Sequence, residues 1–319
     1  MTLTGIQYGT AVKSKDIRGL SSGSLELNAA LSGNPFVGFQ WGRVVEAFGP
    51  EGCGKTTLGL HVVHETQRLR LPAMYIDAEH AIDPLYMEHI GIDLRQLSIS
   101  QPDCGEDALA ICEEAVLAGY KTIVVDSVAM LVPKAELEGN MADAHMGLQA
   151  RMMGKALRRL AGKVRRKQAI VYFINQIRMK IGVMFGNPET TPGGLALKFT
   201  AHYRLDMRAP RGGKVEAKSL TDGTVETGKA VNITVIKNKV YPPFKRATFD
   251  IMYGEGIDKP KDVVEFLKNV GGFTPDKKGT NRIVLGKKKY TVNGLIKALR
   301  DDSEMQKLVI PVIKEIIQR

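Results

Sequence analysis

Residues 49–57 read Gly49-Pro50-Glu51-Gly52-Cys53-Gly54-Lys55-Thr56-Thr57 and match the phosphate-loop pattern G-x-x-x-x-G-K-[ST]. An apolar run, residues 44–48, precedes the loop as a buried strand would, and residues 58–69 have the composition of a helix. Between a strand and a helix, the backbone N–H groups of such a loop and the helix N-terminus attract phosphate. Lys55 would reach the β- and γ-phosphates, and the Thr56 hydroxyl would bind Mg²⁺. We therefore predict a nucleoside triphosphate site rather than an ordinary glycine-rich turn.

Apolar runs alternate with helical patterns after the loop. Strands are predicted at residues 74–77, 122–126 and 169–174, and helices over residues 108–119 and 144–166. The strands are continuously apolar, which is typical of parallel strands buried on both faces. We therefore predict an α/β fold with a mostly parallel central sheet flanked by helices.

The pattern changes after the fourth strand. Residues 177–194 are rich in Gly, Pro and Thr and have no periodicity, which favours a long functional loop. Strands without long intervening helices follow at residues 202–207, 231–236 and 248–253, and we expect them to be antiparallel or mixed at the edge of the sheet. The Gly-, Lys- and Thr-rich residues 209–228 are interpreted as an exposed loop.

Composition divides the chain into three parts. Residues 1–33 are a polar segment, with a short strand expected near residues 6–8, that would serve in oligomerisation or as a linker. Residues 34–256 hold the α/β core. Residues 257–319 are predicted to form a small basic α+β domain, closed by a helix from about Ser303.

Composition, apolar runs and cysteine content limit the class of protein to which this chain can belong. The 319 residues are 44% hydrophobic and 25% charged, which is ordinary for a globular chain. No run of about 18 apolar residues and no secretory signal is present, so we expect neither a membrane span nor export. Three cysteines without paired spacing, Cys53, Cys104 and Cys112, fit a reducing, cytoplasmic compartment.

The net charge of +11 is unevenly distributed. Residues 259–319 hold 14 Lys and Arg against 7 Asp and Glu, a net charge of +7. A basic terminal domain indicates a polyanionic partner, most simply nucleic acid. The alternative is a solvated, lysine-rich surface.

Three residues follow predicted strands at the edge that faces the phosphate loop. Asp126 ends an apolar strand and would hold Mg²⁺ together with Thr56, although a strand-end Asp can also cap a helix. Glu79 lies at the same edge and could act as the base of hydrolysis, or be an exposed loop residue. Gln176 could contact the γ-phosphate, or its amide could cap backbone groups.

Six ordered motifs closely resemble the bacterial RecA recombinase family. They include Ile76-Asp-Ala-Glu-His-Ala-Ile-Asp-Pro-Leu-Tyr86 and the stretch Phe173-Ile-Asn-Gln-Ile-Arg-Met-Lys-Ile-Gly-Val-Met-Phe-Gly-Asn-Pro-Glu-Thr-Thr191. The others lie at residues 49–57, 125–129, 133–139 and 145–153. The resemblance runs from about Ser22 to Ile257, with one gapped region near residues 209–228.

The resemblance implies a RecA-type ATPase that forms a filament on single-stranded DNA, pairs it with homologous double-stranded DNA and promotes strand exchange with ATP and Mg²⁺. It implies that Glu79 is the hydrolytic base, that Gln176 senses the γ-phosphate and that Lys55 is catalytic. It assigns the adenine pocket to Asp83, Tyr86 and Tyr253.

The resemblance also implies two DNA-binding loops, residues 138–146 and 177–194. In this interpretation cations and backbone N–H groups hold phosphates without reading sequence, while apolar side chains separate base triplets. The implied DNA contacts are Met146, Arg151, Arg158, Arg178, Ile181, Gly193 and Gly194. Lys237 and Lys239 match residues that reach the ATP of a neighbouring subunit, and Phe199 matches an interface side chain.

The sequence differs from the family pattern at both ends and in one loop. We expect a divergent member, of viral or other origin, that lacks the family's long N-terminal helix and acidic C-terminal tail. Pro192 and Leu195 stand where the family usually has Thr and Asn. A ring-forming helicase or translocase with the same core is the alternative function. A filament that displays a surface, for instance to activate a self-cleaving repressor, is a further possibility.

Cys53 lies inside the phosphate loop, beside Lys55 and a helix N-terminus. Such surroundings favour a thiol with a lowered pKa. We therefore expect Cys53 to be more reactive toward alkylating reagents than Cys112, which the helical pattern places in the core.

Overall fold

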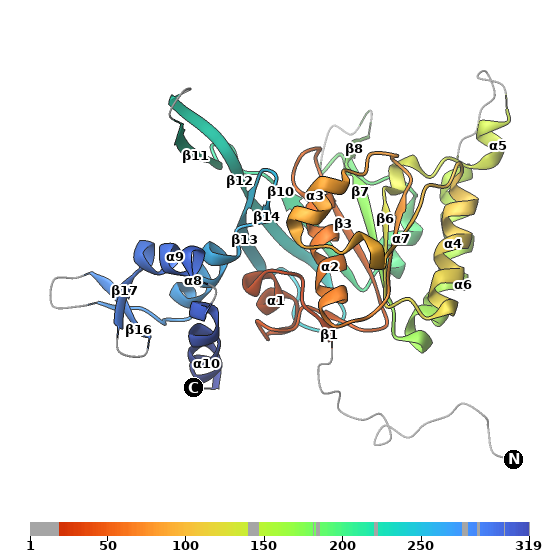
Figure 1. The fold of residues 1–319 in the computed structure, drawn as a ribbon. Coiled ribbons are helices and arrows are strands. Elements are labelled where there is room, and N and C mark those ends of the chain that lie inside the picture. The colour runs from red at the N-terminus through yellow and green to blue at the C-terminus, as the bar shows by residue number, and fades with distance from the viewer. Residues whose placement is uncertain are drawn as a thin grey trace, which may run out of the picture.

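The computed structural model describes residues 19–139, 147–180, 182, 186–219, 223–275, 280–285, 288–302 and 304–318. A large sheet with helices on both faces forms the body, and a smaller unit with its own sheet follows it (Figure 1). Among the described residues, no helix is both long and apolar enough to span a membrane. The strand expected near residues 6–8 lies outside the described residues.

The centre of the large sheet is parallel, as predicted. Its strand order is β14-β13-β12-β10-β3-β7-β6-β4-β5. Six neighbouring strands run parallel: β10 (Tyr203–Arg208), β3 (Arg43–Gly49), β7 (Ile170–Gln176), β6 (Thr122–Asp126), β4 (Ala73–Asp77) and β5 (Leu97–Ser100). Because these strands are parallel, their carboxyl ends meet at one edge of the sheet. The predicted α/β fold is confirmed.

One side of the sheet continues in antiparallel strands. β12 (Gly223–Asn238), β13 (Arg246–Met252) and β14 (Gly256–Ile257) extend it beyond β10. β11 (Lys214–Ser219) pairs with the first half of β12, and this hairpin projects from the body (Figure 1). The prediction of an exposed loop over residues 209–228 was therefore wrong.

The hairpin was not predicted, because glycines and charged residues interrupt the alternation of apolar and polar residues by which a strand is recognised. Val215, Ala217 and Val225 occupy strand positions between lysines, glutamates and threonines. A two-stranded ribbon that projects into solvent has no buried face, so it has no regular alternation of apolar and polar residues.

Helices cover both faces of the central strands. On one face lie α1 (Leu25–Ser32), α2 (Lys55–Arg68) and α3 (Pro84–Ile90), and on the other α4 (Gly105–Ala118), α6 (Leu148–Lys167) and α7 (Leu195–Thr200). Alternation of side chains along each strand divides the core between the faces. Tyr172 and Ile174 of β7 pack toward α2, whereas Val171 and Phe173 pack toward α4 and α6.

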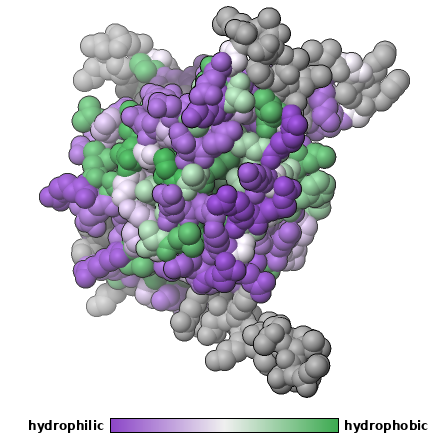
Figure 2. Space-filling view, turned by 90° about the vertical axis from the view of Figure 1, so that its right-hand side faces the viewer, coloured by the Kyte–Doolittle hydropathy of each residue, from purple (hydrophilic) through white to green (hydrophobic). Residues whose placement is uncertain are grey.

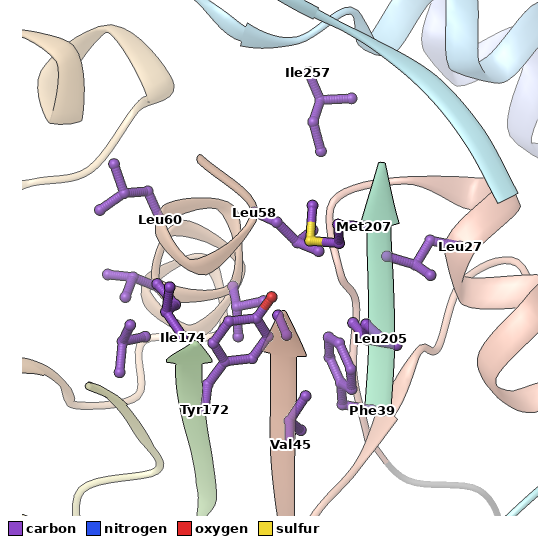
Figure 3. Packing of buried hydrophobic residues seen from close by; sticks show 14 of the residues in the cluster. Leu27, Phe39, Val45, Leu58, Leu60, Tyr172, Ile174, Leu205, Met207 and Ile257 are labelled. Atoms are coloured by element: carbon purple, nitrogen blue, oxygen red, sulfur yellow. The ribbon is translucent and has the colours of Figure 1, made fainter. Parts of the chain in front are cut away.

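The core between the sheet and α2 contains three interlocked aromatic rings. Figure 3 shows Leu58 and Leu60 of α2 above Val45, Tyr172 and Ile174 of the strands. The ring of Phe39 meets those of Tyr172 and Tyr203 edge-on, with centroids 6.0 and 5.5 Å apart. Burial of each such side chain contributes about 1.5–3 kcal/mol, so the cluster anchors α2 firmly to the sheet.

Several short elements surround the core. β1 (Gly19–Leu20) pairs with β2 (Phe39–Gln40), and α5 (Lys134–Leu137) precedes the undescribed residues 140–146. β8 (Arg178–Met179) pairs antiparallel with β9 (Glu189–Thr190), within the segment that was predicted to be irregular. The prediction missed this small ladder because two residue pairs are too short to leave a periodic signal.

The C-terminal unit packs around a hydrophobic cluster of its own. It contains α8 (Lys259–Asn269), β15 (Thr274–Pro275), β16 (Asn281–Leu285), β17 (Lys288–Thr291), α9 (Val292–Asp301) and α10 (Glu304–Gln318). The predicted α+β unit and its closing helix are thus present. Asp262 of α8 joins the unit to the core, because its carboxylate accepts hydrogen bonds from Ser24 Oγ and Leu25 N.

Candidate active site

The phosphate loop connects the carboxyl end of β3 to the N-terminus of α2. Gly52 and Gly54 have φ angles of +67° and +86°, which favour glycine. A Cβ on Gly54 would also lie 2.2 Å from Cδ1 of Ile251, so the loop fits tightly against β13. Lys55 is 8% exposed, and its Nζ donates hydrogen bonds to the carbonyls of Gly49 and Pro50 at 3.1 and 2.6 Å.

Asp126, at the end of β6, lies beside the first turn of α2. Its Oδ2 accepts hydrogen bonds from Thr56 Oγ1 and from the hydroxyl of Tyr75, each at 2.7 Å. The pKa of Asp126 is raised from its ordinary value of 3.8 to about 6, mainly by burial. The two hydrogen bonds lower this pKa, and the nearby Glu79 and Asp77 raise it. The two oxygen atoms that the sequence assigned to Mg²⁺ are therefore adjacent, and oxygen is the ligand type that Mg²⁺ prefers.

Glu79 and Gln176 also meet at this edge. Nε2 of Gln176 donates to Oε1 of Glu79 at 3.4 Å, and the Ser127 hydroxyl donates to the same oxygen. Glu79 itself is exposed, and its backbone N–H donates to the Asp126 carbonyl at 3.2 Å. Three strands, β4, β6 and β7, thus bring a carboxylate, a hydroxyl and an amide to one point beside the phosphate loop.

Two further polar residues lie at this edge of the sheet. The sequence analysis did not identify Ser127, and Asn175 has a structural role. Nδ2 of Asn175 donates to Oε1 of Glu46 at 3.0 Å and to the Pro192 carbonyl at 3.2 Å. Asn175 therefore ties the end of β7 to the far end of the 177–194 segment. Ser127 could have been found from its position, because it directly follows Asp126 at the sheet edge.

A cavity of about 580 Å³ opens beside the phosphate loop. Its lining includes Asp83 and Tyr86 of the α3 region and Tyr253 after β13. The Tyr86 hydroxyl lies 2.8 Å from Oγ1 of Thr57, which links this cavity to the first turn of α2. Asp83 also caps α3, since its Oδ1 accepts from the Tyr86 N–H at 3.1 Å. The residues assigned to adenine therefore share one cavity with the loop.

The lowered pKa expected for Cys53 is contradicted by its burial, whereas its faster alkylation than that of Cys112, whose pKa burial raises to about 12, stays a prediction. The side chain of Cys53 is 1% exposed. Burial raises the pKa of the thiol, and the nearby Lys55 ammonium lowers it by less. The prediction of a lowered pKa was wrong because the thiol is buried in the core between the sheet and α2.

The residues assigned to DNA are only partly described. Arg151 and Arg158 are exposed on α6. Figure 2 shows the side of the molecule on which α6 lies, where hydrophilic residues predominate between smaller hydrophobic areas. Arg178 is exposed in β8. Met146 and Ile181 lie outside the described residues.

Gly193 and Gly194 precede α7 and are held by α6. The N–H of Gly193 donates to Oε1 of Gln149 at 3.1 Å, and Nε2 of Gln149 donates to the carbonyls of Val128 and Leu131. Gln149 therefore connects the start of α6 with both the region after β6 and the second loop. Sequence reasoning missed it because nothing in the local pattern distinguishes this glutamine.

Lys237 and Lys239 lie away from the phosphate loop of their own chain. Lys237 is level with Arg204 of β10, which pairs with Glu46 in the middle of β3. Lys239 donates its N–H to the His202 carbonyl, nearer the amino-terminal end of β3, whereas the loop follows the carboxyl end. Nζ of Lys237 donates to the carbonyls of Lys198 and Phe199 at 2.6 and 2.9 Å, at the end of α7. Phe199 is 71% exposed beside this contact.

Comparisons with known proteins agree with this geometry. A family model described as the RecA N-terminal domain matches residues 5–258. The protein named Protein RecA of Dichelobacter nodosus is 49% identical over 267 residues, which are 83% of this chain and 73% of that protein. The Haemophilus ducreyi Protein RecA is 47% identical over 95% of this chain and 78% of its own length. The Lactiplantibacillus pentosus Protein RecA is 53% identical over 77% of this chain, and the match spans 63% of its length, which is less than two thirds.

Proposed function

This chain belongs to the RecA family of DNA-dependent ATPases and recombinases, and we propose that it pairs single-stranded DNA with homologous duplex in a filament that ATP assembles. The observation that carries the proposal is the meeting of Lys55, Thr56, Asp126, Glu79 and Gln176 at one sheet edge. The alternative of a ring-forming helicase gains no support from the RecA relatives.

Nucleotide binding follows from the family, and we propose Mg²⁺ as its metal. Thr56 Oγ1 and Asp126 Oδ2 would hold the ion, directly or through water, and Lys55 would exchange its bonds to loop carbonyls for bonds to phosphate oxygens. When bound, the ion supplies positive charge that neutralises the oxygens of the transferred phosphoryl group. Asp83, Tyr86 and Tyr253 would hold the base in the adjoining cavity.

Glu79 is proposed as the base for the attacking water. A carboxylate that accepts bonds from Ser127 and Gln176 is fixed in direction and can take a proton from a water beside it. Gln176 would report the state of the nucleotide, because β7 leads from it directly to Arg178 and the second loop. If the Gln176 side chain released Glu79 and donated its hydrogen bond to a γ-phosphate instead, the second loop, residues 177–194, would shift with it.

Members of the family bind DNA and form filaments, and the finer contacts remain proposals. Arg151, Arg158 and Arg178 would neutralise phosphates, and the backbone N–H groups of Gly193 and Gly194 would donate hydrogen bonds to them. Met146 and Ile181 would separate base triplets with their apolar side chains. Lys237 and Lys239 would act on the nucleotide of a neighbouring copy, since they lie away from their own loop. We also propose a cytoplasmic location and an ability to activate a self-cleaving repressor.

The test is ATP turnover with and without single-stranded DNA, combined with electron microscopy of the assembled protein. We expect hydrolysis that depends on DNA and helical filaments that appear with nucleotide. Closed rings, or hydrolysis that DNA does not change, would contradict the proposal.

A further inference from the structure

The antiparallel edge of the sheet packs directly on the phosphate loop. A Cβ on Gly54 would lie 2.2 Å from Ile251 of β13 and 3.7 Å from Cγ2 of Val231 of β12. Val231 is fully buried, so β12 is fixed against the loop at this point. Side chains two residues apart on a strand share one face. Lys229 is therefore carried on the same face of β12 as Val231.

The ammonium group of Lys229 lies over the phosphate loop. A Cβ on Gly52 would meet Nζ of Lys229 at 3.7 Å, with no closer atom. Lys229 lines the cavity of about 580 Å³ together with Lys55, Thr56 and Tyr253. Two lysines from different elements, α2 and β12, thus border the same space.

Lys229 lies near one carboxylate, Glu226, whose pKa it helps to lower, but that carboxylate is paired with Lys214. In the described parts of the chain, the half-buried Lys229 has no ion pair, and its ammonium lies 5.4 Å from the centre of the Tyr253 ring. The nearby carboxylate of Glu226 binds Lys214 at 2.8 Å and also accepts from the Tyr253 hydroxyl. Lys214 is the direct cross-strand neighbour of Lys229, and facing like charges are unfavourable.

We propose that Lys229 is a second phosphate-binding cation of the nucleotide site, supplied by β12 of the same chain. This inference rests on the proposed nucleotide site. The backbone N–H groups of a phosphate loop surround the α- and β-phosphates, and Gly52 is one of its central residues. An ammonium above Gly52 therefore meets these phosphates, whereas Lys55 reaches toward the γ-phosphate.

The position of Lys229 also explains why Tyr253 and Glu226 are arranged as they are. The Tyr253 ring supports the ammonium through its π face, and Glu226 holds the Tyr253 hydroxyl and Lys214. Lys229 and Tyr253 are in this way part of the nucleotide site, whereas Lys214 does not line the cavity. If Lys229 served only to pack on Tyr253, removal of its charge would not change the affinity for nucleotide.

The test compares Lys229→Met, Lys229→Arg and the control Lys214→Met by calorimetric titration with ADP and ATP, with Mg²⁺ and without DNA. Lys229→Met loses a charge-assisted hydrogen bond to a phosphate. It should therefore bind both nucleotides about tenfold more weakly or worse. Lys229→Arg should stay within about threefold of wild type, because it keeps the charge. Lys214→Met should stay within about twofold, because Lys214 is paired with Glu226 and does not line the cavity.

The outcomes separate this inference from the proposed function. Lys229→Met with wild-type affinity for ADP and ATP would overturn the role of Lys229 alone. Weakening in Lys214→Met equal to that in Lys229→Met would also overturn it, because a general loss of positive charge would then explain both. A wild-type chain that binds neither nucleotide would overturn the nucleotide site itself.

Discussion

The edge of the central sheet and the C-terminal unit carry their charges in opposite ways. At the sheet edge Lys55 and Asp126 are 8% and 5% exposed, and each is held by hydrogen bonds to neighbouring groups. In the C-terminal unit Lys288 and Lys289 of β17 are exposed on a small antiparallel sheet. Buried charges act at short range and in fixed directions, whereas exposed charges act collectively and are screened by salt.

The comparison indicates how the two regions should respond to substitution. A substitution at the sheet edge removes a buried charged side chain, and no neighbouring side chain takes over its position. A change in the C-terminal unit removes one of many charges, since residues 259–319 have a net charge of +7. We therefore expect large effects at the first region and graded, salt-dependent effects at the second.

The largest effect is expected for Lys55→Ala. This change removes the cation that lies inside the phosphate loop, so ATP-dependent DNA binding and strand exchange should both be lost. DNA binding with ATP, measured by fluorescence anisotropy, and a strand-exchange assay check this. The exposed Lys134→Ala is the control and should behave as wild type. Strand exchange at the wild-type level in Lys55→Ala would refute the assignment of the loop.

The next effect is expected for Glu79→Gln. The amide has the same shape but cannot accept a proton, so hydrolysis should slow by roughly 10²-fold or more while ATP binding is kept. Filaments on DNA should consequently persist longer, which single-turnover hydrolysis and filament dissociation rates measure. Glu88→Gln, on the exposed side of α3, is the matched control. Turnover within a few-fold of wild type in Glu79→Gln would mean that another group is the base.

The sheet edge was also the region that sequence could predict best. The phosphate loop needs a strand before it and a helix after it, and β3 and α2 occupy the expected residues. Asp126 and Glu79 could be placed because parallel strands end at the same edge. These features depend on local sequence patterns, so they can be predicted from a single sequence without the structure.

The features that sequence did not predict depend on contacts between distant segments. Ser127 and Gln149 carry no local signal, and their roles arise from partners in other elements. Cys53 has neighbours that suggest a reactive thiol, but its burial in the core is set by tertiary packing. Lys229 lies at the base of a hairpin that lacks a buried face, so nothing nearby indicated that it faces the loop.

A smaller effect is expected from the C-terminal lysines. Changing Lys287, Lys288 and Lys289 together to Ala should weaken capture of duplex DNA, although Lys287 lies outside the described residues. Each lost phosphate contact reduces the log–log salt slope by about 0.9, so the slope should become shallower by roughly one to three units. Single-strand binding and ATP binding should change little.

Titration of duplex binding at several salt concentrations measures this slope. Lys268→Ala is the control, because Lys268 is paired with Glu265 at 3.1 Å. An unchanged slope in the triple variant would show that these lysines are only a solvated face.

The smallest effect on activity is expected for Asp262→Asn at the junction of the two regions. Burial raises the pKa of Asp262 to about 7, from an ordinary value of 3.8. Between these values the folded state binds the extra proton, so this group makes the fold more stable as the pH falls from 7 toward 4. Asp262→Asn should flatten that dependence and leave strand exchange unchanged. Urea unfolding at pH 5 and pH 8 tests it, and an unaltered pH dependence would contradict the role of this carboxyl group.

The central claim is that nucleotide at the sheet edge controls homologous pairing of DNA. The most direct measurement is joint-molecule (D-loop) formation between a single-stranded oligonucleotide and a homologous supercoiled duplex, with ATP–Mg²⁺ present and absent. We expect joint molecules with ATP and homologous duplex, and none without nucleotide, with heterologous duplex or with Lys55→Ala. Joint molecules that form equally without ATP, or no joint molecules under any condition, would contradict the claim.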